Sequence, residues 1–257
     1  MTRGRIKIMT EKKAAEQIAA DPRPLMFVDT CNLGNIVGLA LSGKSKMILD
    51  VLRCLQDGIT NKMFYLVVPQ QVYVEFIRPG QFTDVAIHEL AGPIQHWNSA
   101  VQTYNSICKS SNLLTTKNCY SEFDIEKAKQ LYSELVEISK RFLYDAIIIK
   151  ASTRAQKWAR EREIYRKRPA KQGKDSFGDC EICGTTLSFL RTLRGLKFSE
   201  LAYFVSENKA DFAFQEQLHP DLQPDFARVS LAYCQTITQA YGEIWTQHIK
   251  AVRGVKA

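Results

Sequence analysis

Residues 25–29 read LMFVD, an apolar run that ends in a single acid. Pro22 and Pro24 precede this run. A short continuous apolar run is typical of a strand that is buried on both faces, as the strands of a parallel sheet are. We therefore predict a buried strand that ends at Asp29.

Other apolar runs predict further strands of the same sheet. They are residues 64–68, 201–205 and 229–233. Helical spacing of apolar residues occurs between the runs, most clearly over residues 46–56 and 177–194. Strands that alternate with helices indicate an α/β fold, in which helices cover both faces of a central parallel sheet.

The middle of the chain has a different pattern. From about residue 84 to 170 it is helical and polar, with no convincing strand, so we expect an insertion on one side of the sheet. The predicted organisation is one domain over residues 1–257, with its core over about 24–78 and 175–250 and a helical insertion over about 84–174.

The composition excludes several classes of protein. The 257 residues are 45% hydrophobic and 24% charged, which is typical of a globular chain and not of a disordered or collagen-like one. The longest apolar runs fall far short of the roughly 18 residues that a membrane-spanning helix needs. The N-terminus has no apolar signal segment, and the seven cysteines are scattered. We expect a cytoplasmic protein without a membrane partner.

The net charge of +8 is concentrated in residues 150–174, which we call the basic segment. It holds ten basic and two acidic residues, whereas the rest of the chain has 25 of each. Such a segment is typical of a surface that binds a polyanion, although a solvated helix face has the same composition. The residues expected to contact phosphates are Arg160, Arg162, Arg166, Lys167, Arg168, Lys171 and Lys174.

Acidic residues follow the predicted strands at the edge where open parallel sheets bind ligands. Asp29 ends the first strand, Glu75 lies one helical turn after the second, and Asp211 follows the third. Asp179 lies near the start of a helix. Taken singly, each acid is better explained as a helix cap or a solvated charge. Taken together, they form a set of hard oxygen ligands that suits Mg²⁺ or Mn²⁺, ions that can activate water for displacement at phosphorus.

Four segments around these acids resemble, in order, the motifs of PIN-domain nucleases. They are residues 29–33 (DTCNL), 68–76 (VPQQVYVEF), 178–182 (GDCEI) and 205–212 (VSENKADF). The resemblance covers about residues 24–235 and implies a Rossmann-like three-layer α/β/α fold. A long basic helical insertion before the third motif resembles the larger bacterial PIN-like proteins.

The resemblance also implies roles for individual residues. The implied catalytic and metal-holding residues are Asp29, Glu75, Asp179 and Asp211, with support from Asn208, Asp175 and Ser206. Two positions depart from the family pattern, because Cys31 replaces the usual Asn and Asn208 is neutral where many members carry Asp. The second departure lowers the negative charge of the site and disfavours tight binding of a second metal.

These implications predict a metal-dependent endoribonuclease that uses Mg²⁺ or Mn²⁺ and cleaves single-stranded or structured RNA. A protein inhibitor such as an antitoxin, and a second copy of the chain, are further partners that the resemblance leaves open. One alternative is a nucleic-acid-binding or regulatory protein with a decayed site. Another is a nucleotide hydrolase, since residues 38–45 (GLALSGKS) match the P-loop pattern and include Lys44.

Overall fold

The structure is a computed structural model that describes residues 7–38, 54–77, 142–171 and 175–246, together with residues 95, 98, 99, 101–103, 106 and 140. The greater part of the predicted helical insertion lies outside the described residues.

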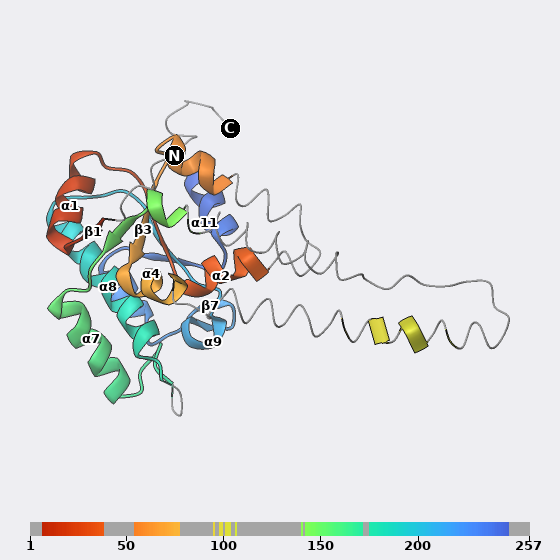
Figure 1. Ribbon diagram of the computed structural model, residues 1–257. Helices are drawn as coiled ribbons and strands as arrows, with labels where there is room; N and C mark the ends of the chain where they lie inside the picture. The colour runs from red at the N-terminus through yellow and green to blue at the C-terminus, as the bar shows by residue number, and fades with distance from the viewer. Residues whose placement is uncertain are drawn as a thin grey trace.

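The strands of the main sheet are short, and the four inner ones are almost fully buried. Their bounds are Ile8–Met9 (β1), Leu25–Val28 (β2), Tyr65–Pro69 (β3), Ile147–Ile149 (β4), Ala202–Val205 (β5) and Ala232–Cys234 (β8). They pair in parallel in the order β1-β4-β3-β2-β5-β8 (Figure 1). The predicted α/β fold with a central parallel sheet is therefore confirmed.

Helices connect and cover these strands. Their bounds are Glu11–Ala20 (α1), Thr30–Gly38 (α2), Gln70–Ile77 (α4), Thr153–Ile164 (α7), Phe177–Gly195 (α8), Lys209–Phe212 (α9), Gln223–Arg228 (α10) and Ile237–Ile244 (α11). In Figure 1, α1, α7 and α8 lie on one side of the sheet and α11 lies on the other. A two-stranded antiparallel hairpin, β6 (Ala213–Phe214) and β7 (Gln217–Leu218), follows α9 directly.

One expectation about the middle of the chain is wrong. Residues 84–170 were expected to contain no strand, but β4 lies in the sheet between β1 and β3. All three of its residues are buried, and Ile148 pairs with both Ile8 and Val68. A three-residue apolar run is too short to be distinguished from part of a helix by its periodicity. Residues 147–149 therefore belong to the core.

The register of the sheet brings the ends of three neighbouring strands together. Val28 pairs with Val205, and Val205 pairs with Cys234. Asp29, Ser206 and Gln235 are the next residues along these strands, so their backbones emerge side by side at the carboxyl edge of the sheet. Buried aromatic rings fix this part of the core, with Phe204 packed at 5.1 Å from Phe212 and 5.8 Å from Phe226 between ring centroids.

The longest described helix, α8, is packed tightly along its length. Eleven of its 19 residues are buried, and it packs against α1, α4 and α7. The hydroxyls of Ser188 and Thr192 both donate to the Glu11 carboxylate at the start of α1. One turn before Ser188 on the same face, Gly184 packs directly against the backbone of α7. These contacts fix the position of the first turn of α8 at the carboxyl edge.

No helix within the described ranges is both long and apolar enough to cross a lipid bilayer.

Replacing Gly184 with alanine is expected to destabilise the protein. A Cβ at this position would lie 2.8 Å from the backbone oxygen of Ala155 and 2.9 Å from the Trp158 ring, so α7 must move away from α8. Overpacking of this kind costs about 1–3 kcal/mol of unfolding free energy, measured by urea denaturation. Gly242→Ala is the matched control, since nothing lies within 4 Å of its Cβ position in α11, and it should be neutral or stabilising by up to about 1 kcal/mol. Equal losses in the two variants would contradict this packing.

Candidate active site

Asp29 is a deeply buried acid at the carboxyl edge, with 2% of its surface exposed. Its Oδ1 accepts a hydrogen bond from the Thr30 backbone N–H at 2.6 Å, and its Oδ2 accepts one from the Ser206 hydroxyl at 2.6 Å. The Cys31 thiol also donates to Oδ2, at 3.4 Å. Burial raises the pKa of Asp29, the three hydrogen bonds oppose this shift, and the negative charge of Glu75 adds to it. Asp29 is therefore a buried acid whose charge is stabilised by local donors and disfavoured by a neighbouring acid.

Thr30 connects Asp29 to the second predicted acid, Glu75. Its backbone N–H binds Asp29, and its hydroxyl donates to Glu75 Oε2 at 2.5 Å. The other oxygen of Glu75 accepts from the Gln71 side chain, one helical turn earlier in α4, at 2.8 Å. These bonds fix the Glu75 carboxylate beside Asp29.

Gly178 brings the first turn of α8 against the same carboxylate. A Cβ on Gly178 would lie 2.6 Å from Glu75 Oε1, so a side chain at this position would occupy space that the Glu75 carboxylate fills. Asp179 is the next residue of that turn and is half-buried. The glycine therefore permits the close approach of the third motif to the second.

Asp211 has a different environment from the other acids. It is 1% exposed, and its Oδ2 accepts from the Asn208 side chain at 2.8 Å. Its Oδ1 lies 3.1 Å from the Lys171 ammonium and 3.6 Å from the Arg168 guanidinium, both from the basic segment. Two cations of the chain itself therefore neutralise Asp211.

Ser206 joins the two halves of the site. Its hydroxyl donates to Asp29 and accepts from the Asn208 backbone N–H at 3.2 Å. Asn208 in turn binds Asp211. A continuous path of hydrogen bonds thus runs from Glu75 through Thr30, Asp29, Ser206 and Asn208 to Asp211.

Asp175, the third supporting residue predicted, lies on the protein surface. Its carboxylate accepts a hydrogen bond from the Phe177 backbone N–H at 3.2 Å, which is the contact of an Asx turn directly before the helix. This contact fixes the loop that enters α8.

The phosphate-binding residues predicted in the basic segment fall into three groups. Arg160, Arg166 and Lys167 are exposed, as a phosphate-binding role requires. Arg162 is largely buried, stacks on Trp158 at 4.7 Å and pairs with Asp225 of α10, so it holds α7 to α10. Arg168 and Lys171 face Asp211. Lys174 and residues 39–45 of the P-loop-like stretch lie outside the described residues.

The site has three contributors to which the sequence alone gave no role. They are Thr30, Gln71 and Gly178. Thr30 and Gly178 each adjoin a predicted acid, and both stand inside segments that resemble family motifs. That adjacency was the signal available in the sequence. Gln71 precedes Glu75 by four residues, the spacing at which helical side chains meet.

The donor chemistry at this edge fits a hard divalent cation. Within the described residues no three His, Cys, Asp or Glu side chains converge closely enough to enclose an ion. Mg²⁺ does not require such a cage, because it keeps several waters and binds through one or two carboxylates. Asp29 and Glu75, joined through Thr30, supply these carboxylates in a setting where burial and mutual repulsion favour a cation.

Asp211 and Lys171 are expected to be energetically coupled. In a double-mutant cycle of Asp211→Asn and Lys171→Met, the combined loss of unfolding free energy should fall short of the sum of the single losses by about 1 kcal/mol, because each single change removes the same ion pair. Urea denaturation without added metal measures this coupling. The cycle of Lys12→Met and Glu16→Gln is the control, since these exposed partners are 4.0 Å apart and should couple weakly. Strict additivity at Asp211 and Lys171 would refute the ion pair.

Comparison with known proteins identifies the family. A family model described as PIN domain matches residues 27–212, more than half of the 257 residues. Comparisons with curated proteins and with solved structures found no match. The matched range contains Asp29, Glu75, Asp179 and Asp211, and the resemblance seen in the four motifs is confirmed. The chain therefore belongs to the PIN-domain family.

Proposed function

We propose that the protein is a metal-dependent endoribonuclease that hydrolyses phosphodiester bonds of RNA at the carboxyl edge of the sheet. Membership of the PIN-domain family implies nuclease-type activity in general. The observation that carries the more specific proposal is the bridge that Thr30 forms between Asp29 and Glu75, with Gly178, the residue before Asp179, packed against the Glu75 carboxylate.

The residues that would hold Mg²⁺ or Mn²⁺ are Asp29, Glu75 and Asp179. Such an ion lowers the pKa of bound water and stabilises charge on phosphate oxygens. Ser206 and Thr30 orient Asp29, and their hydrogen bonds oppose the rise in its pKa that burial causes. Gln71 and Thr30 hold the two oxygens of Glu75 in place. The carboxylates are thus preorganised, so little rearrangement opposes the binding of a cation.

Asp211 supports this site indirectly. Because Lys171 and Arg168 already neutralise its carboxylate, it contributes little negative charge toward a metal. We assign it the role of a positioning residue that holds two cations beside the reaction centre. Those cations, 32% and 28% exposed, remain accessible to the phosphates of a bound strand.

Exposed basic residues nearby supply the electrostatic attraction for RNA. Arg160, Arg166 and Lys167 are exposed, and they precede Lys171, whose ammonium lies 3.1 Å from Asp211. Phosphates bound along this segment would therefore lie close to the acidic edge. The uneven charge of the chain favours a polyanionic substrate over a neutral small molecule.

A catalytically decayed RNA-binding protein is the second candidate. The neutralised Asp211 and the neutral Asn208 favour it, since both reduce the negative charge of the site. A nuclease assay of the purified protein with Mn²⁺ separates the two candidates, because the decayed protein would bind RNA without cutting it.

Asp179→Asn is expected to abolish most of the nuclease activity. The substitution is nearly isosteric and removes the negative charge of a residue at the metal edge. Cleavage of a fluorescent RNA with Mn²⁺ should fall by about a hundredfold or more. EDTA should lower cleavage by the wild-type protein to the same extent. Asp57→Asn removes the same charge from an exposed position and should retain wild-type activity. Full activity of Asp179→Asn would rule out a metal-holding role for this residue.

Exposed residues of the basic segment are expected to control the salt dependence of RNA binding. The variant Arg166→Gln/Lys167→Gln should lower the slope of log affinity against log salt by about 0.7 for each lost phosphate contact with a single strand. The rate of cleavage of bound RNA should stay unchanged. Lys12→Gln/Lys13→Gln removes the same charge from exposed positions of α1 and should leave the slope as it is. Identical slopes in all three proteins would identify the segment as a solvated helix face.

A further inference from the structure

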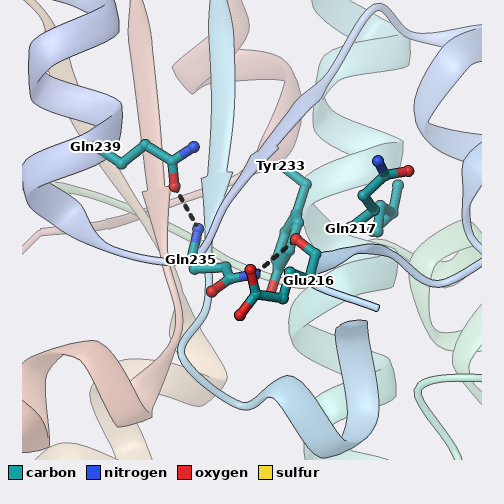
Figure 2. A pocket seen from close by; sticks show the side chains of 6 residues that line it. Glu216, Gln217, Tyr233, Gln235 and Gln239 are labelled. Carbon is teal, nitrogen blue, oxygen red and sulfur yellow. Dashed lines mark hydrogen bonds between the residues drawn. The ribbon is translucent and has the colours of Figure 1, made fainter. Parts of the chain in front are cut away.

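A pocket beside the acidic edge has no role in the function proposed above. Its volume is about 510 Å³, within the range of sites that bind small molecules. It lies between the β6–β7 hairpin and the residues that end β8 and begin α11 (Figure 2). The described residues that line it are Glu216, Gln217, Leu218, Tyr233, Gln235 and Gln239.

Both walls of the pocket are connected to the acidic site. On one side the Tyr233 hydroxyl donates to the backbone oxygen of Ser206 at 2.8 Å, and the Ser206 hydroxyl donates to Asp29. On the other side the hairpin continues directly from α9, which carries Asp211. The pocket is therefore one residue away from Asp29 along the hydrogen bonds of the site.

The pocket wall carries neutral amides and one aromatic ring. Among the described lining residues none is Lys or Arg, and the single carboxylate, that of Glu216, disfavours a phosphate. A glutamine amide offers a donor and an acceptor side by side, the pattern that pairs with the edge of a nucleobase. Tyrosine rings and carboxylates add stacking and an acceptor for base N–H groups. A planar nitrogen heterocycle fits this lining better than a phosphate does.

Hydrogen bonds within the wall hold its side chains in place. The Gln239 side-chain oxygen accepts from the Gln235 backbone N–H at 3.1 Å, and the Gln235 side-chain nitrogen donates to the Glu216 backbone oxygen at 2.6 Å (Figure 2). The Gln239 amide therefore still has its NH₂ group to donate, and the Gln235 amide still has its oxygen to accept. The wall therefore presents both a donor and an acceptor from fixed positions.

Both central residues of the hairpin turn have a left-handed backbone. Gln215 and Glu216 have φ angles of 47° and 63°, in the left-handed region, although neither is glycine. Two left-handed residues in a two-residue loop are typical of the turn that joins tightly paired antiparallel strands. The bond from the Gln235 side chain to the Glu216 backbone oxygen holds this turn against the residues that follow β8.

We propose that this pocket binds one nucleobase of the RNA strand whose backbone lies at the acidic edge, and that it gives the enzyme a preference for that base next to the cleaved bond. The proposal rests on the proposed function, since it takes the same RNA as substrate. The charged and neutral groups lie apart, with the Lys171 ammonium against Asp211 of α9 and the neutral amides at β7 and at the start of α11.

Two measurements test the proposal, with Gln217→Leu/Gln239→Leu as the variant and Gln17→Leu, an exposed glutamine of α1, as the control. The first is binding of four fluorescent RNA homopolymers in EDTA, where no cleavage is expected. The wild-type protein and the control should bind one homopolymer about tenfold more tightly than the least favoured, and the variant should reduce this ratio to about twofold. Equal binding of all four by the wild-type protein, or an unchanged ratio in the variant, overturns the proposal.

The second measurement maps cleavage sites in a mixed-sequence RNA with Mn²⁺. The wild-type protein should cut about tenfold more often beside the base of the favoured homopolymer, and the variant should cut with less discrimination. Cleavage without base preference overturns the pocket proposal and leaves the nuclease intact. Selective binding without cleavage overturns the nuclease and leaves the pocket as a base-binding site.

Discussion

The parallel pairing of β2 with β5 is the constraint on which the candidate site depends. Because Val28 and Val205 are partners in register, the next residues are Asp29 and Ser206, and their side chains meet in a hydrogen bond of 2.6 Å. This bond offsets part of the cost of burying the Asp29 carboxylate. It also gives Asn208 and Tyr233 a fixed partner in Ser206, so the neighbouring elements are positioned by the same residue.

Charge is distributed unevenly across this edge. Asp29 and Glu75 lie close enough for Glu75 to raise the pKa of Asp29, and both are held by neutral donors. Asp211, by contrast, is held against Lys171 and Arg168. The edge thus has an acidic half that favours a cation and a second half in which two partly exposed cations pair with a buried acid. A phosphodiester, which carries one negative charge, is suited to a position between the two halves.

Local patterns in the sequence predicted much of this architecture, but not its long-range pairings. The runs at residues 25–29 and 201–205 predicted β2 and β5 because a buried strand has a distinct composition. β4 was missed because a strand of three isoleucines follows a stretch with helical spacing. The basic segment was recognised as a unit, whereas the inward contacts of Arg162 with Asp225 and of Lys171 with Asp211 depend on tertiary packing, which charge patterning does not encode.

Direct binding of Mn²⁺ to the acidic edge, measured by electron paramagnetic resonance of the purified protein without RNA, is the most direct test of the account. The wild-type protein is expected to show saturable binding of the ion. Asp29→Asn should weaken this binding by about tenfold or more, because the substitution removes the buried charge between Thr30 and Ser206. Unchanged Mn²⁺ binding in Asp29→Asn, or cleavage of RNA by the wild-type protein in excess EDTA, would contradict the account.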